Sequence, residues 1–426
     1  MRISLWLLFL FGAAVAAALF AGSNPGSLTL FWPPYRIDLS LNLFLVLTVA
    51  SFLILHLALR ALSALFAIPS AARSWRQRQR ERGMQLSLLE AYSQLVAGRF
   101  VRAKKAAETV LAQVHGLTAS GEELVYSSRL LSVAHLLAAE AAHSLQDRGA
   151  REFHYRAALE FAAKGVAPEP GEGARLRAAL WALDDRDAAG ALQRLDEMGQ
   201  GAARRTLALR LRLKAARMAG RSVMALEAAR LLAKHHALSQ TAARGVLGGL
   251  AVELIGSAHD PAQLLQAWAV LEPTEQVMPD VAIAAAQRLL VLGGSAAVGR
   301  QWLLPIWQRM LDQPTGLGQH QCVNLVRALD AGFASSAESL LDSDWLTRIE
   351  SAQLSHPGDA VLQYLAGVTC MRLQLWGKAR QLLQQSLQRL QDDDLRRDAW
   401  RHLAELALVQ DDTQAATEAW RNAAQI

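Results

Sequence analysis

Two long apolar stretches without charged residues constrain this chain more than any other feature. The first covers residues 3–21, and the second covers residues 39–59 and contains Asn42 and His56 as its only strongly polar side chains. A helix rises 1.5 Å per residue, so about 20 apolar residues cross the ~30 Å hydrocarbon layer of a bilayer. The sequence therefore predicts two membrane-spanning helices, joined as a hairpin.

The arginines predict the orientation of these spans. The linker between them carries only Arg36 and Asp38, whereas Arg2 precedes the first span and an arginine cluster follows the second. Cytoplasmic segments of membrane proteins carry the excess of Lys and Arg, so both ends of the hairpin are expected in the cytoplasm. A cleaved signal peptide is the alternative for the first stretch, but its apolar run exceeds the ~7–15 residues usual for such signals. Retention is favoured.

The arginine cluster covers residues 73–83, which read RSWRQRQRERG. Directly behind a span, such a cluster determines topology, and anionic headgroups attract it by about 1 kcal/mol per charge. Trp75 fits an interfacial anchor. RNA binding is the alternative, because basic patches that contain an aromatic residue also bind RNA. The five cluster arginines are Arg73, Arg76, Arg78, Arg80 and Arg82.

The charge balance argues against a nucleic-acid-binding domain. The net charge is +6, but residues 1–82 hold eight arginines against two acidic residues, which leaves 36 basic and 36 acidic residues in 83–426. Nucleic-acid-binding domains usually spread Lys and Arg over one face. Cys322 and Cys370 are not spaced as CxxC and are expected to be small buried apolar residues.

The linker between the spans predicts a small β-hairpin. Residues 26–41 read GSLTLFWPPYRIDLSL, with apolar residues alternating on both sides of Pro33-Pro34. This alternation is typical of two short strands joined at a proline turn. With Trp32 and Tyr35 near the interface, the hairpin is expected on the outer surface of the membrane.

Beyond residue 83 the sequence predicts an all-α fold. It is rich in Ala, Leu, Arg, Gln and Glu, and proline and glycine separate short helices. The last 65 residues match the tetratricopeptide (TPR) pattern W-x2-L-G/A-x2-Y-x8-A-x3-F-x2-A in two successive units, one ~34-residue repeat apart with a slightly long turn. Small residues let the two helices of a unit approach closely, while larger ones fill the seam. The positions predicted to pack in this way are Gly367, Trp376, Ala379, Trp400, Leu403, Ala404, Ala416 and Trp420.

Weaker matches to the same pattern occur upstream. Residues 136–159 read as a further helical pair, whereas residues 240–350 contain helices in no clean repeat register. Several matches along one chain favour a TPR-like α-solenoid over 83–426, behind a membrane hairpin with an arginine-rich juxtamembrane segment over 1–82. The upstream positions are Ala91, Gly98, Phe100, Ala103 and Ala107 in one unit, and Ala216, Gly220, Ala225 and Ala229 in another.

These features together resemble the HemY family of proteobacterial inner-membrane proteins. The likeness rests on the two spans and on the stretches YRIDLSL, SWRQRQRER, LLEAYSQLVAGRF, LLAAEAAHSLQDRG and LWGKA. The resemblance implies an inner-membrane protein with a cytoplasmic TPR domain, associated with late haem biosynthesis. The activity of the flavin-dependent protoporphyrinogen oxidase of the same name does not carry over, because no GxGxxG follows a strand here.

Few residues of this sequence are spaced as a catalytic or metal-binding site would require. His235 and His236 are adjacent on an expected helix and point about 100° apart, so they are poor joint metal ligands. His320 and Cys322 are two residue types that a porphyrin iron accepts, but so short a pattern is common by chance. His135, His143 and His154 are expected to line a helix seam or face solvent. We predict no catalytic residue and no metal site.

Acidic clusters and tryptophans have structural explanations. Asp184-Asp185, Asp392-Asp393-Asp394 and Asp411-Asp412 fall at turns between helices, where Asp caps helix N-termini. Five further tryptophans have no repeat register, so some of them are candidates for a groove: Trp181, Trp268, Trp302, Trp307 and Trp345.

The function predicted from these features is that of a membrane-anchored scaffold without enzyme activity. Solenoids present extended surfaces to partner proteins, and a membrane tether raises the effective concentration of those partners at the bilayer. The expected partners are membrane lipid and proteins, late haem-pathway enzymes among them, with no nucleic acid and no required cofactor. The alternatives are a carrier that binds haem or porphyrin directly, and an adaptor for envelope assembly or quality control unrelated to haem.

Overall fold

The computed structural model describes residues 26–119, 126–165, 167–313, 316–334 and 343–426, together with residues 9, 11–16, 18, 19 and 22. The predicted first span, residues 3–21, lies for the most part outside the described residues. The chain divides into two compact units, Met1–Ser127 (unit 1) and Ser128–Ile426 (unit 2). The boundary expected at residues 82 and 83 falls inside a continuous helix of unit 1.

Unit 1 begins with the predicted hairpin. Strands β1 (Ser27–Trp32) and β2 (Tyr35–Ser40) pair antiparallel around Pro33-Pro34, so this prediction is confirmed. Ser40 then caps the next helix, because its side-chain oxygen accepts a hydrogen bond from the N–H of Leu43 at 3.2 Å. The helix that contains the predicted second span therefore begins at Leu41, two residues later than the start predicted for that span.

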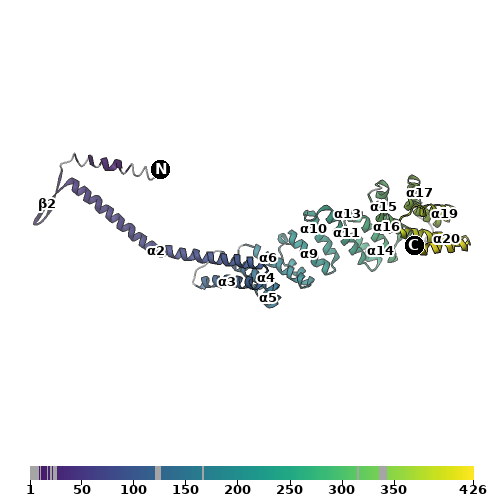
Figure 1. Ribbon diagram of the computed structural model, residues 1–426, viewed down its shortest axis with the longest axis horizontal. Helices are drawn as coiled ribbons and strands as arrows, with labels where there is room; N and C mark the ends of the chain where they lie inside the picture. Colours follow the sequence, from purple (N-terminus) through teal and green to yellow (C-terminus); the bar gives the residue numbers. More distant parts are fainter. Residues whose placement is uncertain are drawn as a thin grey trace. The chain divides into compact units, whose positions relative to one another are not determined.

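A single helix, α2 (Leu41–Val96), runs for 56 residues from the hairpin into the first helical pair (Figure 1). Its last part packs on α3 (Phe100–Ala119). Met84 and Ala91 of α2 are buried, as are the two alanines of α3 at predicted repeat positions, Ala103 and Ala107. The arginine cluster thus lies on the same continuous helix as the residues that begin the repeat packing.

Unit 2 is a series of short helices, each packed on helices near it in the sequence (Figure 1). The helical pairs predicted near residues 136–159, 216–229, 366–386 and 400–423 are all present as two helices joined by a short turn. The helices are α4 (Ser127–Ser144), α5 (Arg148–Lys164), α6 (Glu169–Asp184), α7 (Ala188–Asp196), α8 (Gln200–Ala203), α9 (Thr206–Met218), α10 (Ser222–Lys234), α11 (Gln240–Gly256), α12 (Pro261–Val270), α13 (Pro273–Gln276), α14 (Pro279–Val291), α15 (Ala296–Asp312), α16 (Gln319–Ala334), α17 (Ser343–Ser355), α18 (Ala360–Arg372), α19 (Trp376–Leu387), α20 (Asp393–Val409) and α21 (Thr413–Gln425).

The turns within these pairs share one hydrogen-bonding pattern. Before α19, the N–H of Leu375 donates to the carbonyl of Cys370 at 2.9 Å, and the N–H of Gln374 donates to that of Met371 at 3.0 Å. Gln374 has a positive φ of 60°, as this helix-ending motif requires. The same motif closes α2, α4, α6, α9, α14 and α20, at Gly98, Gln146, Arg186, Gly220, Gly293 and Asp411.

Aspartates at turns between helices begin the following helix. Asp412 accepts a hydrogen bond from the N–H of Ala415 at 3.0 Å, and Asp392 accepts one from Leu395 at 3.0 Å, so the capping predicted for these two clusters is confirmed. The capping predicted for Asp184 and Asp185 is wrong. These residues end α6 and pair with basic side chains, and the cap of α7 is Asp187.

The region without a repeat register also consists of packed helices. α11 packs directly against α14, and the connection between them forms the short helices α12 and α13. Buried residues of α9 to α14 form one hydrophobic cluster, which includes the predicted positions Ala216, Ala225 and Ala229. The insertion of α12 and α13 changes the spacing between consecutive pairs, which is why no register is visible in the sequence.

A substitution at Gly367 tests how closely α18 and α19 approach each other. A Cβ atom at this position would lie 2.9 Å from Leu383 Cγ and 3.2 Å from the backbone nitrogen of Leu383. We expect Gly367→Ala to lower the free energy of unfolding by about 1–3 kcal/mol through overpacking. Urea unfolding of the full chain in detergent measures this change.

Gly377 of α19 provides the matched control, because a Cβ there would meet no atom within 4 Å. Gly377→Ala is expected to leave stability unchanged or to raise it by up to about 1 kcal/mol, since alanine favours the helix. Equal effects of the two substitutions would contradict the close packing of α18 on α19.

Candidate functional site

The β-hairpin has one apolar face. Residues directly opposite each other on paired strands share a face, and three successive pairs are apolar: Leu28–Leu39, Leu30–Ile37 and Trp32–Tyr35. The other face carries Thr29 opposite Asp38 and Phe31 opposite Arg36, whose side chain forms an ion pair with Asp38 at 3.4 Å. Trp32 and Tyr35 are each 70% exposed, so no described part of the chain covers the apolar face at the turn.

The helix that follows is apolar on all sides and uncovered. Leu41–Ser63 of α2 has a mean hydropathy of 2.2, and none of its most apolar stretch is buried in the protein. By length and composition this segment can cross a membrane, and it is the one such helix among the described residues. The predicted pair of spans is therefore supported here for its second member.

Three residues of the arginine cluster have described side chains. Arg78, Arg80 and Arg82 are exposed on α2, whereas the side chains of Arg73 and Arg76 lie outside the described ones. Trp75 is 65% exposed. Trp75, Arg78 and Arg82 are spaced three and four residues apart and therefore share one face of the helix.

The residues at the predicted repeat positions are buried to different extents in the last two helical pairs. Trp376 and Trp400 are half-buried against the hydrophobic cluster of this region, while Trp420 of α21 is 43% exposed. The remaining predicted positions are buried: Gly367, Ala379, Leu403, Ala404 and Ala416. Of the tryptophans without a register, Trp181, Trp307 and Trp345 are buried, and Trp268 stacks on Trp302 with ring centroids 4.4 Å apart.

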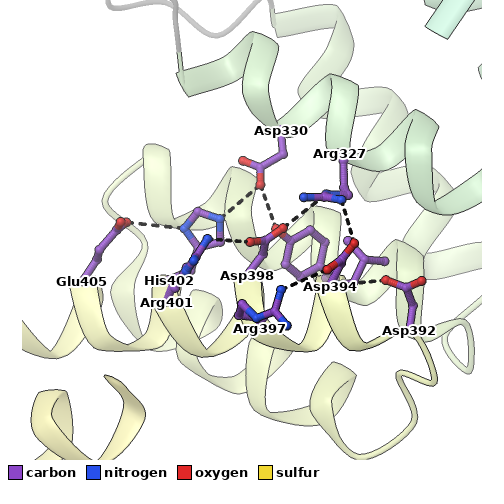
Figure 2. A network of polar contacts seen from close by, with 11 residues as sticks. Arg327, Asp330, Asp392, Asp394, Arg397, Asp398, Arg401, His402 and Glu405 are labelled. Carbon is purple, nitrogen blue, oxygen red and sulfur yellow. Dashed lines mark hydrogen bonds and ion pairs between the residues drawn. The ribbon is translucent and has the colours of Figure 1, made fainter. Parts of the chain in front are cut away.

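A partly buried polar network joins α16, α18 and α20 (Figure 2). Asp330 of α16 accepts a hydrogen bond from the Tyr364 hydroxyl at 2.7 Å, and its same oxygen lies 3.1 Å from His402 Nε2. His402 Nδ1 lies 3.4 Å from Glu405. Farther along α20, the Arg327 guanidinium of α16 pairs with two aspartates, Asp394 and Asp398.

The network keeps His402 protonated at neutral pH. Burial by itself would lower the pKa of His402, but the hydrogen bonds to Asp330 and Glu405 outweigh it and raise the pKa to about 9. Burial would raise the pKa of Asp330, yet the hydrogen bond and charge of His402 hold it below its usual value. Asp330 is thus a carboxylate beside an imidazolium, and the pair fastens α16 to α20.

No local pattern in the sequence predicts this network, because its members are far apart in the chain. Asp330 and His402 are separated by 72 residues. The one local signal is a row of charges at helical spacing on α20, in which Asp394, Arg397, Asp398 and Arg401 pair with each other.

The histidines and cysteines considered for ligand binding are dispersed. His235 and His236 lie in the turn after α10 and not within a helix as expected, with His236 at a φ of 52°. His320 is hydrogen-bonded to Asn324. Burial raises the pKa of the thiols of Cys322 and Cys370, which disfavours the reactive thiolate. Within the described ranges, no three His, Cys, Asp or Glu residues are placed to hold a metal ion.

The three histidines near the start of unit 2 line helix seams. The Nδ1 atoms of His135 in α4 and His154 in α5 are 2.9 Å apart and buried. His143 stacks on Trp181 with ring centroids 5.7 Å apart, and it lies 3.5 Å from Asp184. Of the two placements expected for these residues, a helix seam or the solvent, His135 and His154 take the seam, where they join α4 and α5.

Comparison with known families gives a match in sequence at the start of the chain. Residues 26–146 match the family described as the HemY protein N-terminus, a segment that holds the hairpin, α2, α3 and α4. No curated protein matches the chain.

Solved structures give only distant likenesses. The TPR domain of P58(IPK) is 14% identical over 77% of this chain and 99% of its own, with a TM-score of 0.23. The Cut9–Hcn1 hetero-tetramer of the APC/C is 16% identical over 79% of this chain and 65% of its own, with a TM-score of 0.27. The apo form of RapI is 11% identical over 80% of this chain and 96% of its own, with a TM-score of 0.30.

The His402 network predicts a stability that falls as pH rises. The pKa of His402 is about 9 in the folded chain and 6.5 in its ordinary state. The stabilisation is therefore complete below about pH 6.5 and is lost as pH rises through 9, with a total on the order of 3 kcal/mol. Urea unfolding of the full chain at pH 6, 7.5 and 9 measures it.

The variant His402→Gln separates this effect from other titrating groups. We expect it to lower stability at pH 6 and to remove most of the decrease between pH 6.5 and 9, because the titrating imidazole is absent. An unchanged decrease in the variant would show that His402 is not its source.

Proposed function

Because the chain belongs to the HemY family, through the match over residues 26–146, we propose that it is a scaffold that holds partner proteins at the bacterial inner membrane. It has two domains: a membrane hairpin with the arginine cluster over residues 1–82, and a TPR-like domain over residues 83–426. The observation that carries this proposal is that one continuous helix, α2, contains both the apolar segment Leu41–Ser63 and the residues that pack on α3.

The membrane part of the proposal rests on surfaces that nothing in the described chain covers. The apolar face of the hairpin and the exposed apolar residues of α2 are stable when lipid surrounds them. Phe52 is 73% exposed and Ile54 is 68% exposed. A hairpin with one apolar and one polar face suits the outer interface, where its apolar face rests on the hydrocarbon and its charges face water.

The orientation follows from the arginines. Residues 3–21 supply the first of two spans and stay attached, so the N-terminus and the TPR-like domain both lie in the cytoplasm. The five arginines from Arg73 to Arg82 then meet the anionic inner leaflet one helix segment below the span. Trp75, on the same face as Arg78, anchors the helix at this depth.

Binding and not catalysis is the role of the TPR-like domain in this proposal. Stacked helical pairs bury their small residues against each other and leave long outer faces for partners. The charged groups with shifted pKa values, Asp330 and His402, pair with each other and fasten helices together. The partners that the family suggests are late haem-pathway enzymes, whose porphyrin substrates are poorly soluble, and the tether keeps these enzymes concentrated at the membrane.

Deleting residues 1–82 tests the tether. The truncated chain retains Met84 and Ala91, which are buried where α2 packs on α3, so we expect its helical pairs to fold. Fractionation should find it in the soluble phase. In cells that lack the full chain, it should fail to restore haem output and should leave porphyrin precursors accumulated, as measured by their fluorescence.

The control fuses an unrelated two-span hairpin of the same orientation to residues 83–426. This chimaera is expected to restore haem output if tethering is the function of the N-terminal part. Full haem output from the soluble truncated chain would overturn the proposed tether, and haem output that is normal in the complete absence of the chain would overturn the link to haem.

A further inference from the structure

A groove of about 880 Å³ opens in the region where the repeat register is lost. It lies between α11, the short helix α13 and the start of α14, with Arg309 of α15 and Gln321 of α16 also lining it, and we call it the α11 groove. Val277, which is 46% exposed, and Leu247 supply apolar side chains to its lining. The inserted helix α13 forms one of its walls, so the departure from the repeat is what creates the groove.

On the α11 side of the groove, three glycines leave part of the backbone open beside the apolar side chains of Leu247 and Val252. Gly245, Gly248 and Gly249 all line it, and a Cβ at Gly245 or Gly249 would meet no atom within 4 Å. Gly245 and Gly249 are one helical turn apart, so both lie on the same face of α11. Glycines at this spacing allow the backbone of a second helix to approach closely.

Strong contacts fix the opposite walls of the groove. Glu275 of α13, which is 1% exposed, accepts two hydrogen bonds from the Arg230 guanidinium at 2.6 and 2.9 Å. On the other side, the Gln321 side chain donates to Asp280 at 3.0 Å. The groove is therefore formed before any partner arrives, which reduces the entropy that binding costs.

The charges that line the groove indicate which kind of partner segment can bind there. Arg244 and Arg309 both line the groove and are exposed, and neither forms an ion pair with the described residues. Asp280 is the one acidic residue of the lining, and its carboxylate already accepts a hydrogen bond from the Gln321 side chain. An apolar channel with two unpaired guanidinium groups suits apolar side chains flanked by carboxylates.

We propose that the α11 groove docks an amphipathic helix of a partner protein, with Asp or Glu residues beside the apolar stripe of that helix. The apolar stripe packs on the glycine face of α11 and on Val277, while the carboxylates pair with Arg244 and Arg309. This inference rests on the proposed scaffold function and names the partner surface that the scaffold recognises.

Photocrosslinking of the full chain in its native membrane tests the groove. p-Benzoylphenylalanine replaces Val277 in the groove or, as the matched control, Val291, which is 76% exposed and does not line it. We expect a partner to crosslink at 277 and not at 291, through a segment with apolar residues at helical spacing and flanking carboxylates, as identified by mass spectrometry. A synthetic peptide of that segment is then the binding probe.

Charge reversal tests the recognition. Arg244→Glu combined with Arg309→Glu should weaken binding of this peptide to the full chain in detergent at least about tenfold. Arg421→Glu, on α21 and outside the lining, should leave binding unchanged. Gly249→Leu fills the groove without changing charge and favours the helix, so it should weaken binding while the thermal unfolding midpoint is retained.

Several outcomes overturn the proposal. In the crosslinking experiment, these are no crosslink at position 277, a crosslink from 277 to lipid or to a second copy of this chain, and a crosslinked segment without acidic residues. In the binding experiment, it is peptide binding that survives both the charge reversal and Gly249→Leu. If the tether deletion still abolishes haem output in any of these cases, the α11 groove fails as the docking site and the scaffold function stands.

Discussion

Close approach between short helices is the constraint on which the rest of this structure depends. Each helix of the repeat region has too little apolar surface to be stable alone, so it is stable only when packed on its neighbours. Alanine and glycine at the seams permit the close approach, as Gly367 does where α18 meets α19. The shared turn motif holds consecutive helices antiparallel, and Asp147, Asp187 and Asp412 each cap the helix that follows it. Polar networks such as Asp330 with His402 then fix particular helices to each other.

In the proposed function, the continuity of α2 connects this packing to the membrane anchor. A flexible linker between span and repeats would leave the depth of the first pair undefined. Here the apolar segment, the arginine cluster and the helix that packs on α3 are successive parts of one 56-residue helix. The amphipathic hairpin at the other end of the segment adds a second surface that is stable on lipid. Anchoring and the start of the repeat packing are thus properties of a single element.

Much of this could be predicted from sequence, because the signals are local. The β-hairpin is predicted by the alternation of apolar residues around Pro33-Pro34. The helical pairs that contain Ala216 and Trp400 are predicted by the spacing of small and large residues. The capping by Asp392 and Asp412 was predicted for the same reason. Asp184 and Asp185 were misassigned because the chain turns one residue later than the acidic pair suggests, at Arg186, and Asp187 takes the cap.

What the sequence did not predict depends on contacts between distant residues. Nothing near Asp330 indicates that His402 lies beside it, and nothing near Gly249 indicates a groove, because its walls come from α13 and the start of α16. The irregular region between residues 240 and 350 gave no register for the same reason: α11 packs on α14 across two inserted helices. The candidate docking surface lies where the repeat is least regular.

The most direct measurement of the central claim is the side of the membrane on which each part lies. Single cysteines at Ser27 in the hairpin and at Gln384, an exposed position on α19, are introduced into a chain whose own two cysteines are replaced. A membrane-impermeant maleimide applied to intact spheroplasts should label position 27 and should label position 384 only after the membrane is opened. Labelling of position 384 from outside, or of neither position until the membrane is opened, would contradict the account.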